Sequence, residues 1–112
     1  MAKNFRGPAG RVVVTAAANR TSGEFVVEQG FHGTVTTTTA SGSKYALDIE
    51  QREIEIAELS GAAVGQLVYI TGANALTLTV GSNRLVGKIT KLAGTDSVPT
   101  GKQRMLVLHQ TA

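Results

Sequence analysis

The chain has 112 residues, the length of one ordinary domain, and this length allows one modest hydrophobic core. Its residues are 42% hydrophobic and 17% charged, with no cysteine, which excludes a wholly disordered chain, a disulfide framework and a thiolate metal site. The formal charge is +3, with basic residues near both ends and acidic residues in the middle. This distribution suits contacts between copies of the chain or with a surface of complementary charge.

Residues 1–10 contain glycine and proline without hydrophobic periodicity, so we expect an extended N-terminal arm followed by a single β-rich domain over 11–112. The start of the chain lacks the apolar run of a signal peptide, and no later apolar stretch is long enough to span a bilayer. We therefore expect a product that is made and kept in the cytosol and has no membrane partner.

The rest of the chain reads as short strands separated by turns. Thirteen glycines, many threonines and valines, and an aromatic content of 4% are typical of such a protein, because β-branched side chains suit a pleated sheet and glycine suits tight turns. The expected strands cover residues 11–16, 24–28, 34–38, 45–50, 53–57, 66–70, 76–80, 84–89 and 103–108. About eight short strands at near-regular spacing predict an all-β fold, a small single-domain β-barrel or β-sandwich.

The acidic middle of the chain allows two interpretations. Apolar residues alternate with polar ones on both sides of Gln51 and Arg52, but in opposite parity, so two strands would need a bulge, a corner or a turn at that point. A helix over residues 48–59 is the alternative, since Ile49, Ile56 and Leu59 have partial helical spacing. Farther along, Gly87 inside an expected strand predicts a bulge or a close backbone approach.

Residues that could carry chemistry are isolated in the sequence. His32 and His109 have no partner at metal-ligand spacing, and we expect a turn histidine and a surface histidine. Glu53 and Glu55 would share one strand face, where solvation of the sheet is a better explanation than acid–base catalysis. Nucleophile and phosphate-binding motifs are absent from the sequence. The sequence thus predicts a protein that is not an enzyme and has no metal or cofactor.

A small barrel that binds nucleic acid would interleave aromatic and basic residues on its strands. Here Phe25 and Tyr69 lie in apolar runs typical of a core, which leaves Phe5 beside Lys3 and Arg6 as the one basic–aromatic cluster. We therefore expect no nucleic-acid partner, and a nucleic-acid-binding barrel is kept as an alternative.

Several short motifs, in this order and spacing, resemble tailed-phage capsid decoration (cement) proteins, a family formerly catalogued as a domain of unknown function. Gln66 and Thr34 depart from the residues typical of the family, which are an acidic residue and a valine. The motifs that carry the resemblance are Met1-Ala2-Lys3-Asn4-Phe5 with the following Gly-Pro, Ser22 to Val27, Gly30-Phe31-His32-Gly33, Ala63 to Tyr69, Arg84 to Ile89 and Arg104 to Leu108.

The resemblance implies a β-rich protein that binds the outside of the virion, contacts the major capsid protein and forms a homotrimer. It also implies an N-terminal arm that reaches neighbouring subunits, and an arm with unpaired backbone groups can add a strand to a sheet edge on a partner. The interface candidates are Lys3, Asn4, Phe5, Arg6, Arg11, Glu53 and Glu55. A structural tail component is a further alternative.

Overall fold

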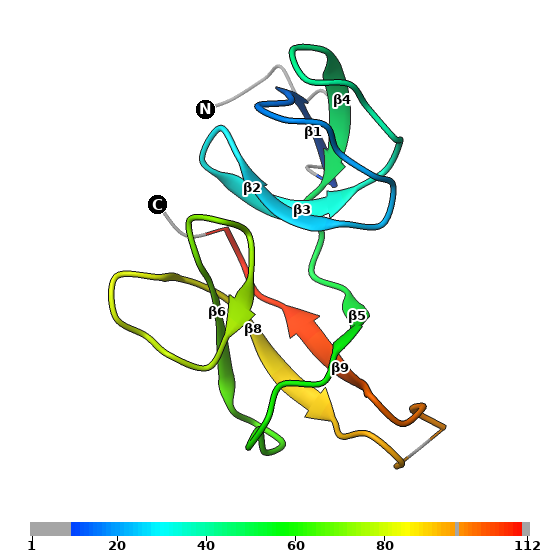
Figure 1. Cartoon of the computed structure of the whole chain (residues 1–112), viewed down its shortest axis with the longest axis vertical. Helices are drawn as coiled ribbons and strands as arrows, with labels where there is room; N and C mark the ends of the chain where they lie inside the picture. The colour runs from blue at the N-terminus through cyan, green and yellow to red at the C-terminus, as the bar shows by residue number, and fades with distance from the viewer. Residues whose placement is uncertain (1–9, 96, 111–112) are drawn as a thin grey trace, which may run out of the picture.

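The computed structural model describes residues 10–95 and 97–110, and in these residues all regular structure is β-strand, arranged in two antiparallel sheets (Figure 1). The predicted all-β class is therefore confirmed. The expected N-terminal arm lies outside the described residues, apart from Gly10. The strands are β1 Arg11–Thr15, β2 Phe25–Glu28, β3 Phe31–Val35, β4 Lys44–Asp48, β5 Glu53–Ala57, β6 Leu67–Ile70, β7 Leu76–Thr77, β8 Arg84–Lys91 and β9 Lys102–Val107.

The first sheet has the strand order β1-β4-β3-β2 and forms the first lobe, drawn in blue to green at the top of Figure 1. Its strands alternate between buried and exposed residues, as expected for a sheet with one wet face. The buried face holds an apolar cluster of Val14, Ala16, Val26, Val35, Tyr45 and Leu47.

The second sheet has the order β5-β9-β8-β6-β7 and forms the second lobe. Its apolar cluster contains Ile56, Val68, Ile89, Met105 and Val107, with half-buried residues from the loops around it. The two lobes thus have separate apolar clusters, and the expectation of one core is wrong. The hydrophobic residues are shared between two sheets, and Phe25 of β2 packs against the cluster of the second sheet.

Residues 49–52 connect the lobes and settle the two interpretations of the acidic middle. β4 ends at Asp48 in the first sheet and β5 begins at Glu53 in the second, so the helix over residues 48–59 is not formed. The change of parity at Gln51 and Arg52 marks the point where the chain leaves one sheet and enters the other.

Two glycines allow a close approach between strands. A Cβ atom on Gly87 would lie 2.1 Å from Met105 Sδ, and the register of the adjacent strand β6 shifts between Val68 and Tyr69 beside it. The bulge expected at Gly87 is therefore confirmed, and the group that lies close to Gly87 is the Met105 side chain. A Cβ atom on Gly33 would lie 2.2 Å from the Asp48 carbonyl oxygen, so this position also requires glycine.

Most strands differ from the expected boundaries by one or two residues, and β3 and β7 differ by three. Gln29 and Gly30 both have positive φ, of 50° and 87°, and such a two-residue turn joins β2 tightly to β3, which begins at Phe31 instead of residue 34. β7 is limited to Leu76–Thr77 because the Thr77 hydroxyl accepts a hydrogen bond from the Thr79 N–H at 3.2 Å, which turns the chain out of the ladder.

Candidate interaction surface

The interface candidates predicted from the sequence fall into three groups. Lys3, Asn4, Phe5 and Arg6 lie outside the described residues. Arg11 is exposed at the start of β1, an edge strand of the first sheet. Glu53 and Glu55 are exposed on β5, an edge strand of the second sheet. The described candidates therefore belong to different lobes, and each lies on an open sheet edge.

The β1 edge is basic and apolar. The Gly10 carbonyl accepts a hydrogen bond from the Ile49 N–H at 3.0 Å, so its backbone faces β4. Because backbone groups alternate in direction along a strand, those of Arg11, Val13 and Thr15 point away from β4. Gln29 Oε1 accepts from the Thr15 N–H at 2.8 Å and covers one end of this edge. Val13 is 68% exposed at its centre. Among the described residues, the backbone groups of Arg11 and Val13 on this edge have no strand partner, and they lie beside one apolar and one cationic side chain.

The β5 edge is acidic. Glu53 accepts a hydrogen bond from the Thr90 hydroxyl at 2.8 Å and lies 3.5 Å from Arg104 Nη1 and 4.0 Å from Lys91 Nζ. The Thr90 hydrogen bond, assisted by the two cations, holds the pKa of Glu53 below its ordinary value. Glu55 lies two residues along on the same exposed face, as predicted. Glu53 is engaged within its own sheet, which leaves Glu55 as the carboxylate better placed to meet a partner.

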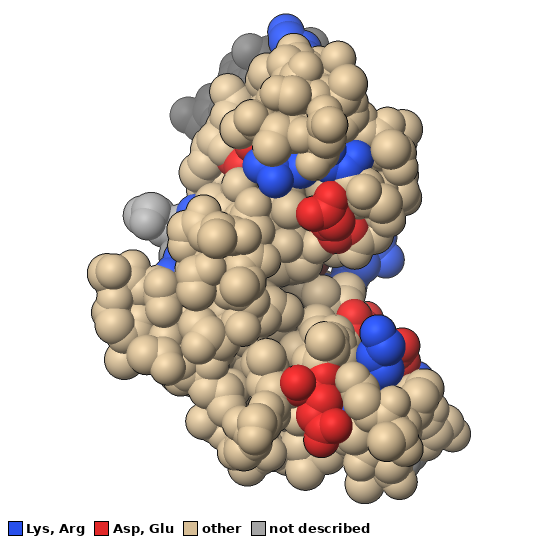
Figure 2. All heavy atoms as spheres, in the orientation of Figure 1, with Lys and Arg blue, Asp and Glu red and all other residues tan. Residues whose placement is uncertain are grey.

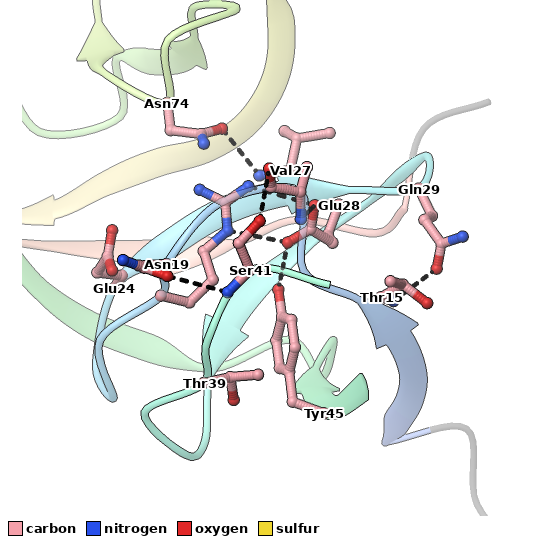
Figure 3. A network of polar contacts seen from close by, with 12 residues as sticks. Thr15, Asn19, Glu24, Val27, Glu28, Gln29, Thr39, Ser41, Tyr45 and Asn74 are labelled. Carbon is pink, nitrogen blue, oxygen red and sulfur yellow. Dashed lines mark hydrogen bonds and ion pairs between the residues drawn. The ribbon is translucent and has the colours of Figure 1, made fainter. Parts of the chain in front are cut away.

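A buried ion pair lies inside the first lobe and was not predicted (Figure 3). Glu28 is 3% exposed, and its carboxylate accepts hydrogen bonds from Arg20 Nε at 2.9 Å, Arg20 Nη2 at 3.2 Å, the Tyr45 hydroxyl at 2.9 Å and the Ala17 N–H at 3.2 Å. Burial raises the pKa of Glu28, but these hydrogen bonds together hold it below its ordinary value. Burial and the bond to Glu28 raise the pKa of Tyr45 to about 12. The network anchors the loop after β1 to β2 and β4.

His32 lies at the junction of the lobes and is fully buried, so the expected turn histidine is wrong. Its Nδ1 accepts from Arg84 Nε at 3.0 Å, and its Nε2 therefore carries the proton and donates to the Leu108 carbonyl at 3.0 Å. Burial and the Arg84 charge lower the pKa of His32, against the effect of Leu108. The error arose because the tight turn ends at Gly30, which places His32 inside β3. His109 is exposed, as expected.

The Gln110 side chain joins the lobes next to His32. Its Oε1 accepts from the His32 N–H at 2.8 Å, and its Nε2 donates to the His32 carbonyl at 2.8 Å. β4 pairs with β3 at Thr34 and Val35, so the Gln110 amide takes the place of a strand partner for the first half of β3. On the other edge of the hairpin, Asn74 Oδ1 accepts from the Val27 N–H at 3.1 Å (Figure 3).

A polar groove of about 600 Å³ runs between the lobes, lined by residues that include Gln29, Asn74 and Asn83. These three side chains are hydrogen-bonded within the protein: Gln29 to Thr15, Asn74 to Val27 and Asn83 to the Thr79 carbonyl. The hydrogen bond from Val27 to Asn74 joins the two lobes, whereas the other two each lie within one lobe.

The described residues contain no group of three or more histidine, cysteine, aspartate or glutamate side chains that could hold a metal ion. All four aromatic residues of the described chain, Phe25, Phe31, Tyr45 and Tyr69, are buried or half-buried, so they form no exposed stacking platform. In the same part of the chain, no helix has the length and apolar character needed to cross a membrane.

The residues that sequence reasoning missed have one recognisable signal. Glu28 follows Val26 at the inward parity of its strand, where a charged residue requires a partner. That pattern could have marked Glu28 as buried. Its partners Arg20 and Tyr45 come from other segments, and no local pattern connects them to it.

Comparison with known proteins found no matching family model, curated protein or solved structure.

Proposed function

We propose that this protein is a capsid decoration (cement) protein, which binds the outer surface of a tailed-phage head as a homotrimer and stabilises contacts between major capsid protein subunits. On this proposal it acts by binding, transforms no molecule and needs no cofactor. Its place of action is the exterior of the virion. The motif resemblance described above supports the proposal.

The observation that carries the proposal is the set of open sheet edges. Within the described residues, the strands β1, β2, β5 and β7 each have a strand neighbour on one side only. An open edge is a template for pairing with another chain, and proteins that work alone usually cover or interrupt such edges. A small protein with four open edges on two lobes is suited to touching several neighbours at once.

The charges on these edges support association. Arg11 makes the β1 edge basic, whereas Glu53 and Glu55 make the β5 edge acidic. Opposite charges at two edges favour a defined orientation between copies or against a capsid surface. Because a ligand that binds only the assembled state stabilises that state, simultaneous contact with several capsid subunits would stabilise the shell. Three linked copies would raise the effective concentration of each weak contact.

The test is binding of the purified protein to phage heads that lack it, measured by co-sedimentation, with the heat resistance of the heads as a second readout. The wild-type protein should bind each head in a fixed number of copies and raise the temperature at which the head releases its DNA. Val13→Asp should weaken binding about tenfold, because it places a charge on the β1 edge. Val80→Asp is the matched control, since Val80 is 58% exposed in a loop.

Two results would overturn the proposal. One is that the protein, added in large excess, does not bind the heads at any salt concentration. The other is an electron-microscopy map of native particles in which the protein occupies the tail instead of the head surface.

A further inference from the structure

A second cleft, of about 330 Å³, lies between the lobes and differs from the polar groove in its chemistry. Phe25, Ile54 and Leu76 supply its apolar floor, and each of them is half-buried against the apolar cluster of the second lobe. Glu24 and Glu55 line the same cleft and are exposed. Figure 2 shows the hollow between the upper and lower lobes, with acidic side chains on both of its sides. The cleft is therefore apolar within and acidic at the rim.

Two open strand edges face each other across this cleft. The Val27 N–H points away from β3 to reach Asn74, so by alternation the backbone groups of Phe25 also point outward from β2. On the other side, the Arg52 carbonyl accepts a hydrogen bond from the Val107 N–H, and the Glu58 N–H donates one to the Gly101 carbonyl. Even-numbered residues of β5 therefore face β9, and the backbone groups of Glu55 point away from it. An extended segment in the cleft could thus form backbone hydrogen bonds with both sheets.

The chemistry of the cleft defines its occupant. A strand that fits should carry a large apolar side chain that faces the floor and, next to it, a cation that faces the two glutamates on the opposite side. Phe5 and Arg6 are adjacent in the sequence and have this arrangement. Phe5 is the large apolar side chain of this segment, so its burial makes it the anchor of the contact.

We infer that the cleft binds residues 3–6 of a second copy of this chain, with Phe5 on the apolar floor and Arg6 beside Glu24 and Glu55. Such a contact joins different surfaces on the two copies, so it repeats from copy to copy and closes a ring if the rotation allows. A ring of three would give the homotrimer. The inference rests on the proposed self-association of the protein but does not require that it binds a capsid.

The experiment uses two full-length variants that each disable one half of the contact. Phe5→Ala removes the anchor and keeps the cleft, whereas Glu55→Lys keeps the arm and reverses a rim charge. Native mass spectrometry and sedimentation should show a trimer for the wild-type protein and association weakened about tenfold or more for each variant alone. An equimolar mixture should form a one-to-one heterodimer, because it contains one intact arm that fits one intact cleft.

Glu58→Lys is the matched control, since Glu58 is an exposed glutamate that follows β5 without lining the cleft. It makes the same charge change and should leave the trimer intact. Thermal unfolding of every variant should match the wild type, which separates lost association from lost folding.

Three outcomes would overturn the inference. The first is a wild-type protein that is monomeric at high concentration, with Phe5 seated in its own cleft. The second is a trimer that survives both variants. The third is a mixture that forms no heterodimer. None of these outcomes depends on capsids. If the protein binds heads but fails this test, the cleft contact is wrong and the proposed function still stands.

Discussion

The two lobes are both antiparallel sheets, of four and five strands, but their interiors are stabilised in different ways. The first lobe encloses a carboxylate, Glu28, whose hydrogen bonds reach Arg20, Tyr45 and the Ala17 backbone. The second lobe encloses aliphatic side chains and Met105, which lies over the bare backbone of Gly87. Its buried Gln103 accepts a hydrogen bond from the Leu59 N–H and donates one to the Leu59 carbonyl, in the segment after β5. Stability of the first lobe should therefore depend on charge and pH, and that of the second on volume.

Breaking the ion pair should have the largest effect. Glu28→Ala leaves the Arg20 guanidinium, 10% exposed, without its carboxylate, and removal of one partner from a buried pair costs about 3–5 kcal/mol. Chemical unfolding of the variant should show this loss in the free energy of unfolding. Glu58→Ala, at an exposed position, should change it by less than about 0.5 kcal/mol. A Glu28→Ala loss no larger than that of the control would contradict the assigned role of the network.

The stability of the second lobe should depend on the volume of its buried side chains. Met105→Ala should cost about 3 kcal/mol by leaving a cavity, and Gly87→Ala about 1–3 kcal/mol by overpacking, because its new Cβ atom would lie 2.1 Å from Met105 Sδ. The double variant should lose less than the sum of the two, since the shortened side chain makes room for the methyl group.

Gly72→Ala is the control for the effect of a glycine-to-alanine change without overpacking, because a Cβ atom there meets nothing within 4 Å. Strict additivity of the two losses in the second lobe would show that Gly87 and Met105 do not share the same space.

The smallest effect is a pH dependence at the junction of the lobes. The pKa of His32 in the folded protein lies below its ordinary value of 6.5, so on acidification the unfolded chain takes up the proton first. Stability from His32 should be complete above pH 6.5 and decrease as the pH falls below it. The Glu28 contribution should be lost only below its ordinary pKa of 4.5, in a separate and more acidic window.

Unfolding measured between pH 7 and pH 5 tests the His32 assignment. His32→Gln should flatten the slope over this range, and His109→Gln should keep it, because His109 is exposed. An unchanged slope in His32→Gln would assign the pH dependence to another group.

The strands could be predicted from the sequence because each depends on local alternation, as at Glu53–Ala57, and on glycine turns. The break at Gln51 and Arg52 was also visible, but its meaning was not, since a change of parity does not say whether the chain turns within a sheet or passes to another. The division into two apolar clusters and the burial of His32 depend on contacts between distant segments, such as that of His32 with Leu108. The cleft between β2 and β5 was hidden for the same reason.

The Gln110 amide has a consequence for the synthesis of the protein. The first lobe is built from residues 10–48, so its sheet can form while the second lobe is still being translated. In β3, water must then satisfy the His32 backbone until Gln110, 78 residues later, has left the ribosome. The two hydrogen bonds of the Gln110 amide can form only after translation of the second lobe.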